Sequence, residues 1–283
     1  MAGIGDNTSK VTKYDNPNRT LTDPYEGQQL GEIWGYVVDG YFKTDEEARN
    51  YKVDQSFVNQ MINASALDNG LHAGDLKFVD LDGNNKIEQT TSANDRKDMK
   101  VIGNSLPRYN YNFGISADWY GIDFSVLFQG IGKQNWYPGA ETSMFWGPYS
   151  RPYASFIPSD FMSQVWSEEN TDAYFPRPRG YVALGSNREL AVVNTKYLQN
   201  LAYCRLKNLS IGYTLPDKWL SKIGFEKIRV YFSGENLLTF TKLHSDYIDP
   251  EQASASNSWK TSKSDANIYP LSLIHISEPT RLL

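Results

Sequence analysis

The segment from residue 106 to residue 130 alternates apolar and polar side chains on both sides of a tight turn. Every second residue of its first half is aromatic or apolar: Tyr109, Tyr111, Phe113, Ile115, Ala117 and Trp119. The residues between them are small or polar, from Asn110 to Asp118. This period of two is typical of a β-strand, and it continues for about ten residues. A tilted β-strand of about that length can cross a bilayer. The segment therefore predicts a spanning strand with one face suited to lipid and the other to water.

The second half of the segment repeats this alternation and completes a hairpin. Phe124, Val126 and Phe128 alternate with polar residues, and the two halves meet at Tyr120-Gly121, where glycine can supply a positive φ. Aromatic residues stand at both ends of the first strand, as they do at the two interfaces of a membrane. A soluble antiparallel sheet shows the same alternation, with its apolar face covered by a core, so one hairpin leaves both alternatives open.

The composition favours a strand-rich protein and argues against a nucleic-acid-binding protein or an enzyme. Aromatic residues make up 14% of the 283 residues, which favours strands and interfaces, and the net charge is −5. No basic run is present that would neutralise a phosphate backbone, so nucleic acid is not an expected partner. The lone Cys204 and three histidines form no legible nucleophile or metal motif, and we expect Cys204 to pack as a small apolar residue. The chain is not expected to be an enzyme.

A second hairpin is predicted from residues 202–215 and 227–240, which also alternate, with Pro216 ending the first strand. The link between these strands is short, whereas residues 131–195 and the segment after residue 242 are long and lack periodicity. This asymmetry is typical of membrane barrels, which have short turns on one side and long loops on the other. Residues 44–67 predict a short surface helix capped by Thr44.

The two ends of the chain carry little structural information. The first ten residues lack the charged and apolar regions of a signal peptide, so we expect an exported protein with this sequence to have its signal elsewhere, in a longer chain. Residues 271–281 match an in-frame translation of a common sequencing adapter. We therefore expect residues 1–270 to form one barrel segment and residues 271–283 to be a read-through scar.

Four segments together resemble the SusC/RagA family of TonB-dependent outer-membrane transporters. These are GEIWGYVVDGYF (31–42), DRKDMKVIGNSLPRYNYNFG (95–114), VWSEENTDAYFPR (165–177), and YCRLKNLSIGYTLP with VYFSGENLLTFTK (203–242). The resemblance implies an all-β fold, in which an antiparallel meander forms the C-terminal arc of a large barrel of the 22-stranded type with long extracellular loops. The plug domain, the TonB box and the closing strand of that family are missing from the sequence.

The resemblance also implies a function in the bacterial outer membrane. Such transporters import oligosaccharides, and in some cases peptides, with energy supplied through TonB acting on the plug, and a SusD-like lipoprotein commonly covers the barrel from outside. No cofactor is required by this activity. The alternative is a secreted, calcium-bearing β-sandwich that binds glycans, in which the aromatic faces would turn inward to a core.

An acidic loop at residues 80–95 is a candidate calcium site. Alternate oxygens in a tight loop converge on one hard cation, and Asn85, which tolerates left-handed geometry, stands where such loops usually place glycine. The candidate ligands along the loop are Asp80, Asp82, Asn84, the carbonyl of Lys86, and Glu88. The resemblance adds Asp95 as the closing acid. A bound Ca²⁺ would be structural, and the alternative is a solvated acidic turn.

Aromatic residues in the long loops are candidates for stacking on sugar rings. They are Trp136, Tyr137, Trp146, Tyr149 and Tyr153, and the alternative is that they pack the loops together or lie at the membrane boundary. Adjacent Glu168 and Glu169 cannot flank a glycosidic bond from two sides, so no catalytic residue is predicted. We expect the charged residues Arg177, Arg179, Asp118 and Glu235 to line the lumen or brace loops.

Overall fold

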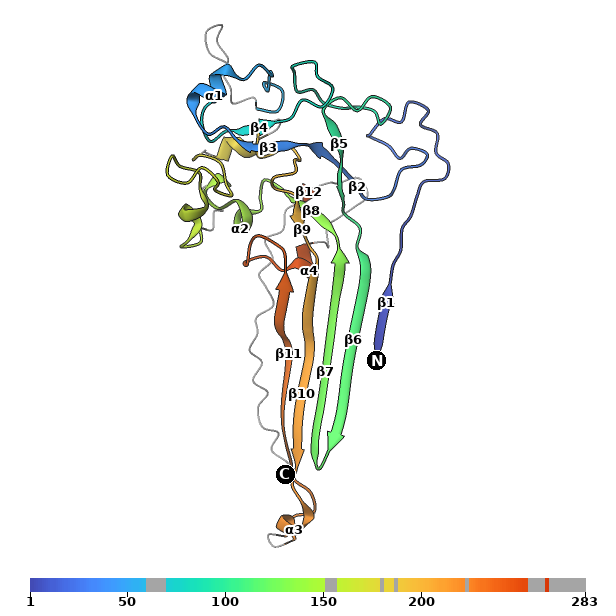
Figure 1. Ribbon diagram of the computed structural model, residues 1–283. Coiled ribbons are helices and arrows are strands. Elements are labelled where there is room, and N and C mark those ends of the chain that lie inside the picture. The colour runs from blue at the N-terminus through green and yellow to red at the C-terminus, as the bar shows by residue number, and fades with distance from the viewer. Residues whose placement is uncertain are drawn as a thin grey trace.

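The computed structural model describes residues 1–59, 70–150, 157–178, 181–185, 188–221, 224–253 and 263–264. Figure 1 shows a long, narrow antiparallel sheet that extends from one end of a broader cap of short strands, short helices and loops. The read-through scar predicted at residues 271–283 lies outside the described residues.

The long sheet has the strand order β1-β6-β7-β10-β11, and every neighbouring pair is antiparallel. Its strands are β1 (Ala2–Gly5), β6 (Arg108–Trp119), β7 (Ile122–Lys133), β10 (Tyr203–Thr214) and β11 (Arg229–Thr241). Both predicted hairpins are confirmed within a few residues of their expected ends. Among the described residues the sheet remains an open arc, because neither β1 nor β11 pairs with a further strand.

Short connections join the long strands at the end of the sheet that lies away from the cap. Tyr120 and Gly121 link β6 to β7 with φ values of 47° and 85°, the pair of positive angles that a two-residue hairpin turn requires. β10 ends before Pro216, and helix α3 (Asp217–Leu220) begins directly after it. The described parts of the long connections, within residues 131–195 and 242–253, lie in the cap, which agrees with the predicted division into short turns and long loops (Figure 1).

The cap is built from small sheets and single helical turns. Strand β2 (Glu32–Tyr36) pairs with β5 (Met99–Asn104), and β3 (Val38–Tyr41) pairs with β4 (Leu76–Phe78). A third small sheet contains β8 (Asn135–Pro138), β9 (Gln199–Asn200) and β12 (Lys263–Ser264). The other helices are α2 (Ser143–Trp146), α4 (Pro250–Ala253) and 3₁₀ turns at Gly147–Tyr149, Phe161–Gln164 and Tyr181–Leu184.

Helix α1 (Asp45–Asn50) is shorter than the helix predicted over residues 44–67. The cap residue is confirmed, since the Thr44 hydroxyl accepts the backbone N–H of Glu47 at 3.1 Å. The helix ends because the Tyr51 ring packs on Phe42 and its hydroxyl donates to the carbonyl of Phe78, which fixes Tyr51 in an extended conformation. Of the remaining predicted residues, 60–69 lie outside the described part of the chain.

The main hydrophobic core lies in the cap and is rich in aromatic side chains from residues 36–78 and 136–197, to which residues 243–253 add Leu243, Ile248 and Ala253. The long strands contribute little to it, because their side chains point to the two open faces of the sheet. Within the described residues, no helix is long and apolar enough to span a membrane.

Candidate functional site: a two-faced sheet and its cap

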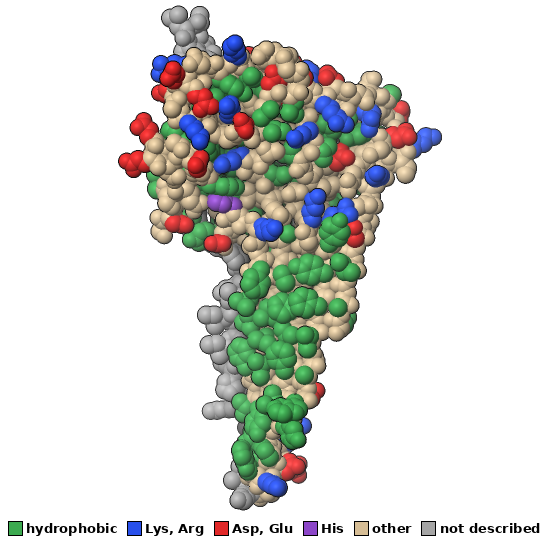
Figure 2. Space-filling view, in the orientation of Figure 1, with side chains coloured by type: hydrophobic (Ala, Val, Ile, Leu, Met, Phe, Trp, Pro, Cys, Tyr) green, Lys and Arg blue, Asp and Glu red, His purple; other side chains and the backbone are tan. Residues whose placement is uncertain are grey.

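One face of the long sheet carries a continuous apolar strip. Residues paired across neighbouring strands share a face, and one such row runs Ile115, Val126, Leu209, and the next Ala117, Phe124, Ile211, Phe232. Many of these side chains are exposed, as Ile115 is at 61% and Phe232 at 50%. Figure 2 shows the strip as an unbroken area of hydrophobic side chains below the cap. No described segment covers it.

The opposite face is mostly polar, although Leu127 and Tyr231 also lie on it. Four serines form one row across four strands, and the hydroxyls of the first two, Ser116 and Ser125, lie 3.2 Å apart. The full row is Ser116, Ser125, Ser210 and Ser233. The sidedness predicted for the first hairpin is therefore confirmed, and it extends across β10 and β11.

Aromatic side chains mark the two ends of the apolar strip. Trp119 and Tyr120 lie at the hairpin turn, 70% and 86% exposed, with their rings packed edge to face. At the other end the rings of Tyr109 and Tyr111 stand over Gly132 and Gly130, so both belong to the apolar face. Amphipathic rings at both ends of an apolar strip are the arrangement that two membrane interfaces favour.

An ion-pair network attaches the segment after β11 to the polar face of the sheet. Arg205 on β10 is only 2% exposed, and its guanidinium donates to the carboxylates of Asp249 and Glu251, each at 2.7 Å. Lys207, at a bulge in the same strand, also donates to Glu251 at 2.7 Å. The network fixes residues 242–253, including α4, against the long sheet.

The acidic loop folds as a set of tight turns around two aspartates. Asp80 accepts the backbone N–H groups of Gly83 and Asn85, each at 2.7 Å, and Asp82 accepts that of Asn84 at 3.1 Å. Asn85 has a φ of 61°, which confirms the left-handed conformation expected there. Burial by itself would raise the pKa of Asp80, but the backbone hydrogen bonds hold that pKa below its usual range.

The acid that joins Asp80 and Asp82 is Asp98, which was not among the predicted ligands. Carboxylate oxygens of the three residues lie within 4.8 Å of one another. Asp98 is fully buried and accepts the N–H groups of Leu81 at 2.9 Å and Glu88 at 2.7 Å. Its burial raises its pKa, and the nearby charges of Asp82 and Asp80 add to this. Three acids held this close suit a hard divalent cation, which would relieve their repulsion.

The other predicted ligands lie in the turns beside these three acids, and neither Glu88 nor Asp95 is among the acids that come within 4.8 Å of one another. The Asn84 amide donates to both Asp82 and Glu88, and the Lys86 N–H donates to the Asn84 side chain. Asp95 lies in a separate turn, where its own N–H donates to the carbonyl of Ser92. The position assigned to Asp95 is thus taken by Asp98, which precedes β5 and is fixed by that strand's pairing rather than by the loop spacing.

The aromatic residues predicted for ligand stacking form part of the cap core. The indole of Trp146 donates to the carbonyl of Gly139 at 2.9 Å, and the hydroxyls of Tyr137 and Tyr149 donate to the carbonyls of Leu190 and Pro176. The four described rings are buried, so none of them offers an open face to a ligand. They pack the loops together, which is the alternative stated for them above. The residues concerned are Trp136, Tyr137, Trp146 and Tyr149, and Tyr153 lies outside the described residues.

Charged residues of the loops act as braces where the structure describes them. The Arg177 guanidinium donates to the fully buried carboxylate of Asp75 at 2.7 Å, which confirms its bracing role, and Arg179 lies outside the described residues. Asp118 and Glu235 lie on the polar face of the long sheet. Glu168 and Glu169 are both exposed in one turn, with no enclosed site around them.

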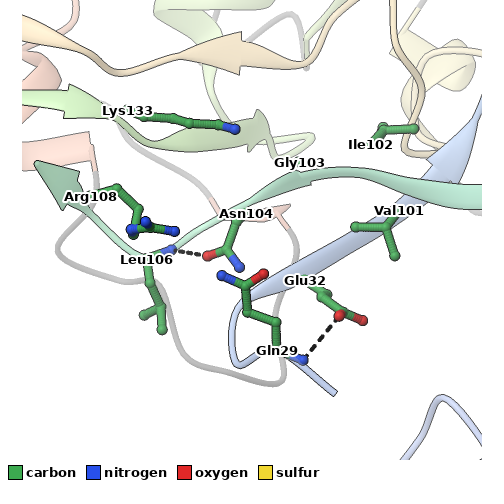
Figure 3. Close-up of a pocket in the computed structure, with 9 residues that line it drawn as sticks. All are labelled: Gln29, Glu32, Val101, Ile102, Gly103, Asn104, Leu106, Arg108 and Lys133. Atoms are coloured by element: carbon green, nitrogen blue, oxygen red, sulfur yellow. Dashed lines mark hydrogen bonds between the residues drawn. The ribbon is translucent and has the colours of Figure 1, made fainter. Parts of the chain in front are cut away.

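A polar pocket of about 250 Å³ lies where the long sheet enters the cap. Figure 3 shows its lining: Gln29 and Glu32 from the segment at β2, residues 101–106 from β5 and the link to β6, and Arg108 and Lys133 from the cap ends of β6 and β7. Sequence reasoning did not find this pocket, because its residues come from three distant segments.

Known proteins show clear similarity to the chain, although no protein-family model matches it. TonB-dependent receptor P3 of Formosa agariphila is 30% identical over 228 residues, which cover 80% of this chain and 19% of that receptor. TonB-dependent receptor P39 of the same organism is 27% identical over 241 residues, or 22% of its length. The chain thus spans about a fifth of these curated relatives.

Solved structures share the fold. The RagAB peptide importer in its open-open state matches 96% of this chain and 25% of the importer chain, with a TM-score of 0.56 and 19% sequence identity. The closed-closed state of the same importer gives a TM-score of 0.50.

Proposed function

Because this chain belongs with the SusC/RagA-like TonB-dependent receptors, we propose that it forms part of the wall and the outer cap of an importer in the bacterial outer membrane. The single observation that carries this proposal is the sidedness of the long sheet. An open apolar strip backs directly onto a row of serines, with aromatic residues at both ends of the strip.

This sidedness suits a sheet between lipid and a water-filled lumen. In the secreted β-sandwich considered above, a second sheet would cover the strip and bury Ile115, whereas Ile115 is 61% exposed. Burial of these side chains in hydrocarbon is favourable, at roughly 25 cal/mol per Å² of apolar surface. The arrangement therefore favours a lipid-facing wall.

The proposed cargo is a solute too large for a porin, either an oligosaccharide or a peptide. Support comes from the relatives: the receptors of Formosa agariphila are TonB-dependent, and the RagAB structures are of a peptide importer. By analogy, energy would come from the TonB complex, and a SusD-like lipoprotein would cover the cap. We expect a strain that lacks the gene to lose growth on one oligosaccharide or peptide in a panel, and growth on every member would contradict the proposal.

The orientation of the sheet can be tested directly by fluorescence quenching. In a complete receptor that carries these residues and Cys204→Ser, a single cysteine replaces either Ile115 or Ser116 and is labelled with a fluorophore. We expect brominated lipid to quench the label at position 115 and a water-soluble quencher to act on position 116. Equal quenching at both positions, or the reverse pattern, would contradict the membrane placement.

The acidic loop is proposed to bind a structural Ca²⁺ through Asp80, Asp82 and Asp98. The like charges of these groups and their spacing support the proposal. We expect Ca²⁺ to raise the thermal unfolding temperature of the receptor, and Asp82→Asn to remove most of that increase. The matched control Asp95→Asn lies outside the cluster and should keep it. An unchanged Ca²⁺ response in Asp82→Asn would rule out the site.

A further inference from the structure

The polar pocket of Figure 3, here called the rim pocket, lies at the boundary between the apolar strip and the cap. Arg108 is the first residue of β6 and Lys133 the last residue of β7, and the two are paired across the strands. Figure 2 shows lysine and arginine side chains gathered where the apolar strip ends beneath the cap. The pocket thus lies at the level of the outer membrane interface, given the membrane placement proposed above.

The guanidinium of Arg108 lies on the lipid-facing side of the sheet. A Cβ added to Gly132 would lie 3.0 Å from Cβ of Tyr109, so the Tyr109 side chain stands over that glycine, on the face that carries Phe128. The guanidinium carbon of Arg108 lies 5.0 Å from the centre of the Tyr109 ring, within the limit of about 6 Å for a cation–π contact. Tyr109 has a φ of 56°, which interrupts the strand alternation and allows neighbouring residues to share one face.

Lys133 is the cation of the rim pocket that is open to an anion. Arg108 forms an ion pair with Asp6, in which its Nη2 donates to the carboxylate at 2.6 Å, and this contact orients the guanidinium. Among the described residues, none forms an ion pair or hydrogen bond with the Lys133 ammonium. The acid in the lining, Glu32, already accepts the Tyr25 hydroxyl at 2.6 Å and the Gln29 N–H at 3.0 Å. An arriving anion therefore meets an available ammonium beside a pre-oriented guanidinium.

We propose that the rim pocket binds the phosphate group of an outer-leaflet lipid. Arg and Lys together recognise phosphate well, and cations next to a membrane interface attract anionic headgroups. The volume of about 250 Å³ lies just below the range of roughly 300–1,000 Å³ of small-molecule sites, so it suits a headgroup. The attached hydrocarbon chains would then lie along the apolar strip, which begins directly below Tyr109.

Native mass spectrometry of the complete receptor tests this inference, which rests on the proposed membrane placement. The receptor is purified from nanodiscs that contain a phosphorylated lipid A glycolipid in phosphatidylcholine, and bound glycolipid is counted. Each lost cation should weaken retention about fivefold, so we expect Lys133→Ala to lose most bound glycolipid and Lys133→Arg to keep it. The matched control Lys218→Ala, on α3 at the opposite end of the sheet, should retain the wild-type amount.

Two results would overturn the inference. One is equal glycolipid retention in Lys133→Ala and the wild-type receptor. The other is displacement of the glycolipid by inorganic phosphate at millimolar concentration, which would identify a soluble anion as the ligand. Because quenching at positions 115 and 116 reports membrane placement separately, a failure here is distinguishable from a failure of the proposed function.

Discussion

At the residue scale, Gly130 on the lipid-facing strip has no room for a side chain. An added Cβ would lie 2.1 Å from the carbonyl oxygen of Tyr203 and 2.5 Å from the Tyr111 ring. The Tyr111 hydroxyl also donates to that carbonyl at 3.0 Å, so the ring is fixed over the glycine and bridges β6 to β10 across β7. The packing of one ring therefore contributes to the register of three strands.

We expect Gly130→Ala to destabilise the folded barrel by about 1–3 kcal/mol, because overpacking forces the ring and the strand apart. Unfolding in urea, followed by the gel mobility of the unheated receptor, measures this loss. The matched control Gly5→Ala lies in a strand of the same sheet with open space around the added Cβ, and it should be close to neutral. Equal stability of the two variants would contradict the close packing.

We expect His244 to make the stability of the cap depend on pH. Its ring stacks on Tyr174 with centroids 3.4 Å apart, and Nε2 lies 2.8 Å from the Gln164 side-chain oxygen. Burial lowers the pKa of His244 below 6.5, and the Lys196 ammonium acts in the same direction, against the nearby Asp246 and Asp160. The neutral ring is therefore the form that the fold accommodates.

Because the folded state binds the proton less readily than the unfolded state, the free energy of unfolding is highest above about pH 6.5. It decreases as the pH falls through the pKa of His244 in the folded state. We expect amide exchange in the cap to accelerate over that range in the wild-type receptor and much less in His244→Phe, which keeps the stacking but cannot be protonated. The control His72→Phe removes a half-exposed histidine and should leave the acceleration in place. An identical pH dependence in His244→Phe and wild type would argue against this role.

At the scale of elements, the segment of residues 242–253 is attached to the long sheet by an ion-pair network. Arg205 supplies the attachment, with its three donor nitrogens directed to Thr239, Asp249 and Glu251. Asp249 is fully buried, and its carboxylate also accepts the backbone N–H of Glu251 at 2.9 Å.

We expect Arg205→Leu to cost about 3–5 kcal/mol, because it removes the guanidinium that forms an ion pair with the buried Asp249 carboxylate. Protease cleavage within residues 242–253 and thermal unfolding measure the effect. Lys207→Met serves as the control, since it removes a more exposed partner of Glu251 and should cost about 1 kcal/mol or less. The double variant Arg205→Leu, Asp249→Leu should recover much of the loss, and failure to do so would point to a role for Arg205 other than charge compensation.

The long strands and the cap differ in how far the sequence predicts them. Alternation reveals β6, β7, β10 and β11 because one face of each meets an apolar phase and the other a polar one. The cap has no such signal, since Trp136 and Tyr149 come from segments without periodicity and their burial depends on packing against distant loops. The third acid of the acidic cluster escaped prediction for the same reason, because β5 pairing, rather than loop spacing, brings Asp98 to Asp80.

At the scale of the whole molecule, the two faces of the sheet should respond oppositely to an added charge. We expect Ile115→Arg to reduce folding into lipid vesicles, by about 2–4 kcal/mol near the middle of the bilayer, and Ser116→Arg to have little effect. The two positions are adjacent in β6, so chain location is matched and only the face differs. Similar folding yields for the two variants would contradict a lipid-facing strip.

The order of the strands has a consequence for how such receptors diversify. β1 and β6 are neighbours in the sheet, yet residues 6–107 lie between them in the chain and form much of the cap. The insertion leaves and rejoins the sheet at one strand pair, but it also shares the cap core with residues 136–197 and pairs with them at Tyr36 and Asn194. New recognition surfaces can therefore evolve only when both parts of the cap change together, while the membrane scaffold is inherited unchanged.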